Sequence, residues 1–219
     1  MKKLALAVAL TLTGTAVLAS GPSIPYDPPV TPPAPIAAYD WSGAYIGLGV
    51  TYAQGGMQNT AGGVPVLPSA NGVGVGVIGG YNWQSGNTVF GGEVALDFAN
   101  PEGSNDCGAG APNVCTTRMM NHASIRGRVG YAMDRTLVFA TLGYATDRRS
   151  LTHTGAAPLF SVSHRHNGPM IGIGIEHAMS SAWSVRGDLE HYFMGTQTYA
   201  VVPARADINL VRISVVRHF

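Results

Sequence analysis

The sequence predicts an all-β fold, namely an eight-stranded antiparallel up-and-down β-barrel that crosses a membrane with its strands. Three observations predict this class. Between positions 40 and 219, apolar residues alternate with polar or small residues at a period of two, and no good 3.6-residue apolar stripe occurs. Short turns alternate with long polar loops along the chain, as in transmembrane barrels. No segment after the N-terminus offers the roughly twenty continuous apolar residues of a spanning helix, so insertion has to use strands.

The N-terminal residues are expected to lie outside the barrel. Residues 1–19 place Lys2 and Lys3 ahead of an apolar stretch that ends in small residues, the pattern of a secretory signal peptide. That stretch is short and diluted by threonine and glycine, which argues against a retained membrane helix. Residues 20–39 are too rich in proline for a helix or a strand ladder and are expected to form an extended periplasmic tether. The barrel domain is then residues 40–219.

The strands follow from the alternation, segment by segment. The first sends Ile46, Leu48 and Val50 to one face and glycines to the other, so one face is suited to lipid. The fifth is apolar on both parities, and its faces cannot be assigned. The eight predicted strands are assigned over 44–52, 72–83, 90–98, 119–131, 136–146, 171–177, 183–193 and 210–219. Tight turns are expected at 84–87, 132–135 and 179–182, and long external loops at 54–71, 100–117, 147–161 and 195–206.

Aromatic residues gather at the predicted strand ends, as amphipathic rings do at the two interfaces of a membrane. On the side of the short turns, the expected girdle is Trp41, Tyr81, Trp83, Phe90, Tyr131, Trp183 and Phe219. On the side of the long loops it is Tyr52, Phe98, Tyr144 and Phe193. Two girdles separated by aliphatic residues are not needed in a soluble sandwich.

Charged residues of the strands fall on the same parity as the small residues, so they are expected to point into the barrel. The set is Glu93, Asp97, Arg126, Arg128, Glu176, Arg186, Asp188, Glu190 and Arg212. The interior of an eight-stranded barrel is just wide enough to be filled by side chains. We therefore favour a network of ion pairs that plugs the lumen over a gated ion path, which is the alternative.

Composition and cysteine content limit the function classes. Lys2 and Lys3 are the only lysines, so the mature chain is close to neutral and a nucleic-acid partner is not expected. Cys107 and Cys115 lie in one Gly/Pro/Asn-rich stretch of an exported chain, which favours a disulfide closing a short surface loop. Two thiols without a nearby histidine are too few ligands for a closed zinc site, and no metal is expected.

Three further patterns suggest chemistry only weakly, and we expect no cofactor. The GxGxxG match from Gly74 to Gly79 leads into a hairpin, not a helix, so it lacks the context of a dinucleotide site. Loop histidines 153, 164 and 166 could approach one another and offer axial ligands to haem, but surface histidines are usually just solvated. His191 would suit a lipid-modifying enzyme, yet no serine lies on the outward parity beside it.

Several phrases together carry a resemblance to a known family. They are DWSGAYIGLGVTYAQG, GGYNWQSGNTVFGGEVALDF, SIRGRVGYAMDRTLVFATLGYA, GIGIEHAMSSAWSVRGDLEHY and a chain that ends in phenylalanine. From residue 40 to 219 the sequence resembles the small outer-membrane β-barrel proteins of proteobacteria, which include opacity-like and porin-annotated surface antigens of alphaproteobacteria. The resemblance implies that the barrel-assembly machinery reads Phe219. Arg217 departs from the family, which more often has an aromatic or apolar residue there.

The expected protein is therefore a non-enzymatic integral protein of the bacterial outer membrane, with a role in envelope integrity and in displaying its loops. Expected partners are outer-membrane lipid and lipopolysaccharide, the assembly machinery during biogenesis, and host or environmental ligands at the loops. The alternative is a narrow porin-like channel or a surface protein that captures haem or another ligand.

Overall fold

The computed structural model describes residues 39–61, 67–106, 113–155, 160–199 and 202–219. The predicted signal peptide and almost all of the predicted tether lie outside these residues. Within them, no helix has the length and apolar character to cross a membrane. The strands are β1 (Gly43–Asn59), β2 (Ser69–Ser85), β3 (Thr88–Ala99), β4 (Glu102–Asp106), β5 (Val114–Met133), β6 (Thr136–Thr154), β7 (Phe160–Ala178), β8 (Trp183–Tyr199) and β9 (Val202–His218).

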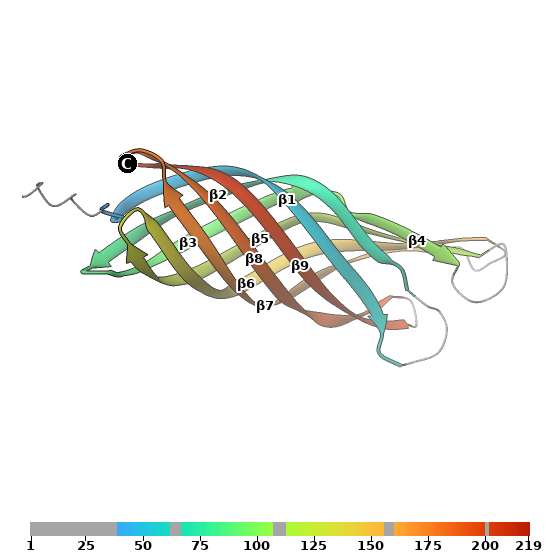
Figure 1. Cartoon of the computed structure of the whole chain (residues 1–219). Coiled ribbons are helices and arrows are strands. Elements are labelled where there is room, and N and C mark those ends of the chain that lie inside the picture. Colours follow the sequence, from blue (N-terminus) through green and yellow to red (C-terminus); the bar gives the residue numbers. More distant parts are fainter. Residues whose placement is uncertain (1–38, 62–66, 107–112, 156–159, 200–201) are drawn as a thin grey trace, which may run out of the picture. The chain divides into compact units, whose positions relative to one another are not determined.

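The strands of the unit from Ala37 to Phe219 form one closed antiparallel ring (Figure 1). Each long strand pairs with its neighbour in sequence, and β1 closes the ring by pairing with both β2 and β9. A closed ring leaves no unpaired edge, so every backbone polar group can be satisfied without water. The predicted up-and-down barrel is confirmed.

One position of the ring is shared by two strand segments, β3 and β4, so the eight predicted strands are observed as nine within the described residues. β3 and β4 both pair with β5, and the chain is interrupted between them at Asn100 and Pro101. Proline has no N–H to donate to a ladder, which explains the break. The Pro101 carbonyl still accepts a hydrogen bond of 2.9 Å from the Met119 N–H.

The three tight turns lie where they are predicted, at one end of the barrel that we call the turn end. Gly86 and Asp134 there have positive φ values of 59° and 51°, a conformation that glycine and aspartate tolerate best. The opposite end, which carries the long connections, is called the loop end. Both Tyr39 and Phe219 lie at the turn end, because Phe219 N–H donates to the Ala44 carbonyl and Tyr39 packs on Trp41.

The predicted loop boundaries are wrong, because the strands continue far into all four segments. β1 runs on to Asn59, β6 to Thr154 and β8 to Tyr199. The alternation persists there with its outer face turned polar, while apolar side chains such as Met57 and Leu151 still point inward. The loss of outward apolar residues marks the end of the membrane, not the end of the sheet.

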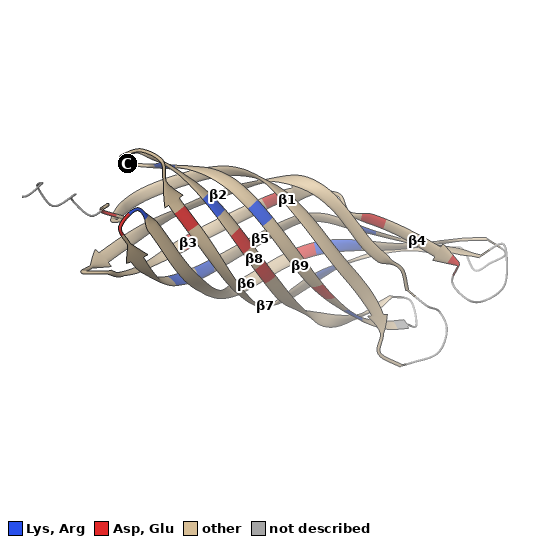
Figure 2. Cartoon of the chain, viewed as in Figure 1, with Lys and Arg blue, Asp and Glu red and all other residues tan. Residues whose placement is uncertain are grey.

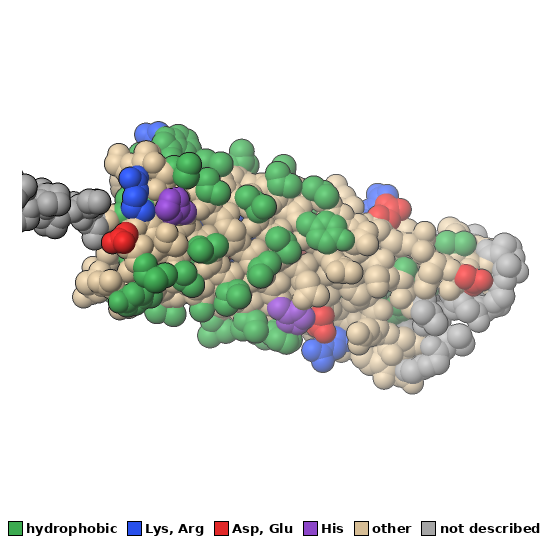
Figure 3. Space-filling view, viewed as in Figure 1, with side chains coloured by type: hydrophobic (Ala, Val, Ile, Leu, Met, Phe, Trp, Pro, Cys, Tyr) green, Lys and Arg blue, Asp and Glu red, His purple; other side chains and the backbone are tan. Residues whose placement is uncertain are grey.

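The outer surface carries an apolar band, seen as green side chains on the visible face in Figure 3. Leu48, Ile125, Leu142 and Ile213 are 63–66% exposed, which is expected only of side chains that face lipid. The predicted girdle residues are also exposed, with one exception. Trp41 is fully buried in a cluster inside the turn end, so its assignment to the girdle is wrong.

The fifth barrel position, β6, now has assigned faces. Leu137 and Phe139 point inward and are at most 3% exposed, whereas Val138 and Leu142 face outward. The sequence pattern was ambiguous because the lumen at the turn end is itself apolar. The cluster there, which we call the turn-end plug, comprises Trp41, Val89, Ala132, Leu137, Phe139 and Ala178.

Candidate functional site

The lumen contains a buried network of charged side chains, and the structure places all nine predicted members inside it. Each is at most 5% exposed. They come from five of the strands, and Figure 2 shows charged positions distributed along the middle of the barrel. The alternation of the strands turns these side chains inward. Glycines at many of the neighbouring inward positions leave room for them. We call this set the lumen network.

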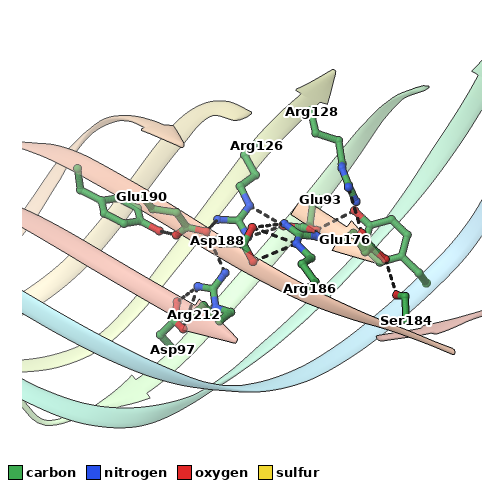
Figure 4. Close-up of polar contacts among 12 residues, drawn as sticks. Glu93, Asp97, Arg126, Arg128, Glu176, Ser184, Arg186, Asp188, Glu190 and Arg212 are labelled. Atoms are coloured by element: carbon green, nitrogen blue, oxygen red, sulfur yellow. Dashed lines mark hydrogen bonds and ion pairs between the residues drawn. The ribbon is translucent and has the colours of Figure 1, made fainter. Parts of the chain in front are cut away.

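Glu93 lies at the centre of the network (Figure 4). Its carboxylate accepts hydrogen bonds from Arg126 and Arg186 and from the Tyr45 hydroxyl, the last at 2.8 Å. Arg186 is also held by Asp188, with a donor–acceptor distance of 2.7 Å from Nη2 to Oδ1. Two arginines thus balance the charge of the carboxylate and the Tyr45 hydroxyl adds a further hydrogen bond, which is the arrangement that makes a buried charge tolerable.

The network continues toward the loop end through Glu190. This carboxylate accepts hydrogen bonds from Arg126, from the Tyr192 hydroxyl and from Arg212, the last at 3.0 Å. Arg212 then donates to both oxygens of Asp97, at 2.7 and 3.0 Å. One chain of ion pairs therefore runs from Asp97 to Asp188 across strands that are far apart in sequence.

A second, smaller group surrounds Glu176 near the turn end. Its Oε2 accepts a hydrogen bond of 3.1 Å from Arg128, and its Oε1 accepts one of 2.6 Å from the Ser184 hydroxyl. His218 Nε2 lies 2.9 Å from the same Oε1 and 3.1 Å from Ser184 Oγ. Both contacts use one ring nitrogen, so these residues do not form a Ser-His-acid triad, in which opposite nitrogens face the serine and the acid.

Phe139 joins the two groups. Its ring lies 4.0 Å from the guanidinium carbon of Arg128 and 4.6 Å from that of Arg186. Close contact of guanidinium groups with an aromatic ring is favourable because the faces of the ring carry negative charge. Gly174 makes room for this ring, because a Cβ there would lie 2.2 Å from Phe139 Cζ.

Sequence reasoning did not include Tyr45, Phe139, Ser184, Tyr192 and His218 in the network. Four of them lie on the inward parity of strands whose faces were assigned, and that parity was the available signal. A prediction restricted to charged side chains does not include their uncharged hydrogen-bond partners. Phe139 lies on the strand that could not be assigned.

Beyond the girdle at the loop end, a third polar group lies inside the barrel wall. Arg149 Nε donates to Asp147 at 2.8 Å, and the two ring nitrogens of His166 lie 2.8 Å from the Gly195 carbonyl and 2.8 Å from the Tyr199 hydroxyl. Burial lowers the pKa of His166 and raises the pKa of Tyr199. His166 is therefore held neutral, donating from Nδ1 and accepting at Nε2.

The weaker chemical patterns receive no support from this geometry. Both nitrogens of His166 are used in hydrogen bonds, so the three loop histidines do not form a preformed haem ligand set. Gly74 to Gly79 lies within β2, and β3 follows the hairpin. His191 Nδ1 lies 2.7 Å from Asn209 Oδ1. Among the described residues no group of three or more His, Cys, Asp or Glu side chains could hold a metal ion.

Of the three remaining predicted site residues, the two that the structure describes, Cys115 and Phe219, lie at opposite ends of the barrel. Cys115 is buried at the loop end and disulfide-bonded, and its predicted partner Cys107 lies outside the described residues. Phe219 is 71% exposed at the turn end. Arg217 lies between two aromatic side chains, 5.3 Å from the Trp183 ring and 5.4 Å from that of Phe219, which accommodates the unusual charge at this interface.

Comparisons with known proteins agree on one family. The model of the outer membrane protein beta-barrel domain matches residues 7–219. The 31 kDa outer-membrane immunogenic protein of Brucella melitensis is 28% identical over 214 residues, covering 89% of this chain and 88% of that protein. The 22 kDa outer membrane protein of Rhizobium leguminosarum is 33% identical over 108 residues, 49% of this chain and 44% of that protein.

Solved structures of similar shape are also outer-membrane proteins. OprG of Pseudomonas aeruginosa has 9% identity and a TM-score of 0.49, and covers 81% of this chain and 96% of its own. The Ail protein of Yersinia pestis, in complex with a heparin analogue, has 10% identity and a TM-score of 0.47, and covers 81% and 99%. Similarity at this level carries no information on function. From the family match over residues 7–219, the chain belongs to the outer membrane protein beta-barrel domain family and is a protein of the bacterial outer membrane.

Proposed function

We propose that this protein is a non-conducting, non-enzymatic structural element of the outer membrane, which contributes to envelope integrity and presents its loop end to the surroundings. The observation that carries the proposal is the filled lumen. Glu93, Arg126, Arg186 and Arg212 are at most 2% exposed and are all bonded to one another or to neighbouring charges. An ion crossing the barrel would have to replace several of these contacts at once.

Apolar clusters on both sides of the lumen network support the same proposal. Trp41 and Phe139 fill the turn end. Toward the loop end, a cluster that includes four methionines and Tyr199 fills the barrel above the network; the methionines are Met57, Met119, Met170 and Met194. Water and ions partition poorly into such packed apolar layers. A conducting protein of this width would need at least one of them to move.

Planar-bilayer recording of the mature protein tests the proposal. We expect no single-channel steps from the wild type. The double variant Arg186→Ala/Arg212→Ala removes two guanidinium groups from the lumen and is the control for a loosened barrel. Reproducible steps from the wild type that change in size or selectivity in the variant would instead support the narrow-channel alternative.

Surface presentation has a separate basis. The Brucella relative is named as immunogenic, and we carry this property to the loop end of the present chain as a proposal. In the present chain the long strands β6 and β7 continue well beyond the girdle residues at the loop end. Antibodies raised against the folded protein should label intact cells. Labelling only after the outer membrane has been permeabilised would contradict this orientation.

A further inference from the structure

Four arginines lie on the outer surface at the loop end, and they differ in their partners. Arg118 pairs with Glu102 at 2.6 Å, and Arg205 pairs with Asp207 at 3.3 Å. Arg148 and Arg165 are exposed and form no ion pair or hydrogen bond with any described residue. The outer rim therefore carries one local excess of positive charge.

These two arginines are also direct neighbours. Arg148 of β6 lies opposite Arg165 of β7 in the strand register. Like charges directly opposite each other on one face of a sheet destabilise it. The repulsion is relieved when an anion binds between them, and the planar guanidinium groups suit a phosphate because each can donate two parallel hydrogen bonds.

The height of the pair points to a lipid headgroup. Tyr144, an exposed girdle residue, precedes Arg148 by four residues on the same strand. That is about 13 Å along the strand and about 10 Å along the membrane normal, given strand spacing and tilt. Arg148 and Arg165 lie within β6 and β7 on the exposed outer face of the barrel, at the level where headgroups surround it.

A groove leads from the pair toward the membrane core. It has a volume of about 260 Å³ and crosses β3, β5, β6 and β7. Leu96, Phe98 and Ala123 form its apolar part, and Asn121 and Thr146 lie with the two arginines at its polar edge. The buried residues His122 and Asp147 complete the lining, and the Asp147 carboxylate already pairs with Arg149. An apolar floor below a cationic rim is complementary to an amphiphile that has an acyl chain and a phosphate.

We propose that Arg148, Arg165 and the groove beside them form a binding site for a phosphorylated glycolipid of the outer leaflet, with a phosphate of its lipid A between the two guanidinium groups. The loop end faces outward in barrels of this kind, and lipopolysaccharide is the main lipid of that leaflet. The site is independent of the proposed structural role, because a sealed barrel without bound glycolipid would leave that role intact.

Native mass spectrometry of the detergent-solubilised mature protein tests the site with diphosphoryl lipid A as the probe. The wild type should retain it, and Arg148→Gln/Arg165→Gln should weaken binding about tenfold or more, as expected for the loss of charge-assisted hydrogen bonds. Arg118→Gln/Arg205→Gln is the matched control, since it removes the same charge from the same rim, and it should bind within about twofold of the wild type. Arg148→Lys/Arg165→Lys should retain part of the affinity.

Three results would overturn the proposal. If Arg148→Gln/Arg165→Gln and Arg118→Gln/Arg205→Gln lost the same affinity for lipid A, binding would reflect general charge attraction and not a specific site. If dephosphorylated lipid A bound as tightly as diphosphoryl lipid A, the phosphate would not be recognised by the two arginines. Tight binding of a heparin fragment by the Arg148/Arg165 pair, without binding of lipid A, would make the ligand a soluble polyanion. A folded barrel migrates differently in a detergent gel from the same chain after heating. This shift verifies that each variant is folded, so a loss of binding can be assigned to the substituted residues.

Discussion

Arg186 should be the most sensitive single position of the lumen. Its side chain is fully buried and donates hydrogen bonds to Glu93 and to Asp188. Arg186→Met keeps most of the volume but removes the charge. Glu93 would keep Arg126 and Tyr45, whereas Asp188 would lose the partner in all of its described hydrogen bonds. Removing one partner of a buried ion pair costs about 3–5 kcal/mol, so the free energy of unfolding should fall by about that amount.

The second half of the test is a compensating change. In Arg186→Met/Asp188→Leu the unpaired carboxylate is gone and the charge balance of the lumen is restored, so most of the lost stability should return. Urea unfolding of the reconstituted barrel, followed by the gel shift between folded and unfolded forms, measures both variants. A loss below about 1 kcal/mol for the single variant, or a second loss added by Asp188→Leu, would refute the account of Arg186 as the partner that makes Asp188 tolerable.

Three other predictions concern separate parts of the barrel. Gly174→Ala should destabilise the barrel by about 1–3 kcal/mol in the same urea assay, because the new Cβ meets Phe139. Gly187→Ala is the control and should cost far less, because no atom lies within 4 Å of its new Cβ. Equal effects of the two variants would contradict the close packing of Phe139 on Gly174. Since the pKa of His166 is lowered in the fold, its stabilising contribution should be complete above about pH 6.5 and decline as the pH falls. Amide protection factors, which correct for the pH dependence of the intrinsic exchange rate, should therefore fall toward pH 5 in the loop-end parts of β7 and β8 in the wild type but not in His166→Gln; Asp147, Arg149, His164 and Tyr199 surround the ring there. Phe219→Ala should lower the amount assembled in cells while leaving refolding in vitro unchanged, and equal defects in both would assign Phe219 a purely structural role.

Period-two alternation was sufficient to predict the strands, the tight turns and the faces of most residues. It worked best where lipid and lumen differ most, as on β7, where Ile171, Ile173 and Ile175 alternate with Gly172, Gly174 and Glu176. It failed on β6 because the lumen beside Leu137 and Phe139 is apolar, which removes the contrast on which the pattern depends.

Beyond the membrane, the same rule indicated the wrong element. The outward residues of the strand extensions are polar and most inward residues are apolar, and a polar stretch with turn-forming residues predicts a loop. Arg149 and His166 were therefore not expected inside the wall. The partner of each charged residue was also unpredictable, because Arg212 and Asp97 meet across the lumen from strands separated by 115 positions. Such contacts depend on the stagger of the closed ring, which local sequence does not reveal.

The central claim is that the lumen is sealed and its arginines are dry, and water-edited solid-state NMR of arginine side-chain nitrogens in bilayers tests it most directly. The account predicts negligible magnetisation transfer from water to Arg126, Arg128, Arg186 and Arg212, and strong transfer to Arg148 and Arg165 in the same sample. Transfer to the lumen arginines as fast as to the two rim arginines would mean that a continuous water path crosses the barrel, and it would contradict the account.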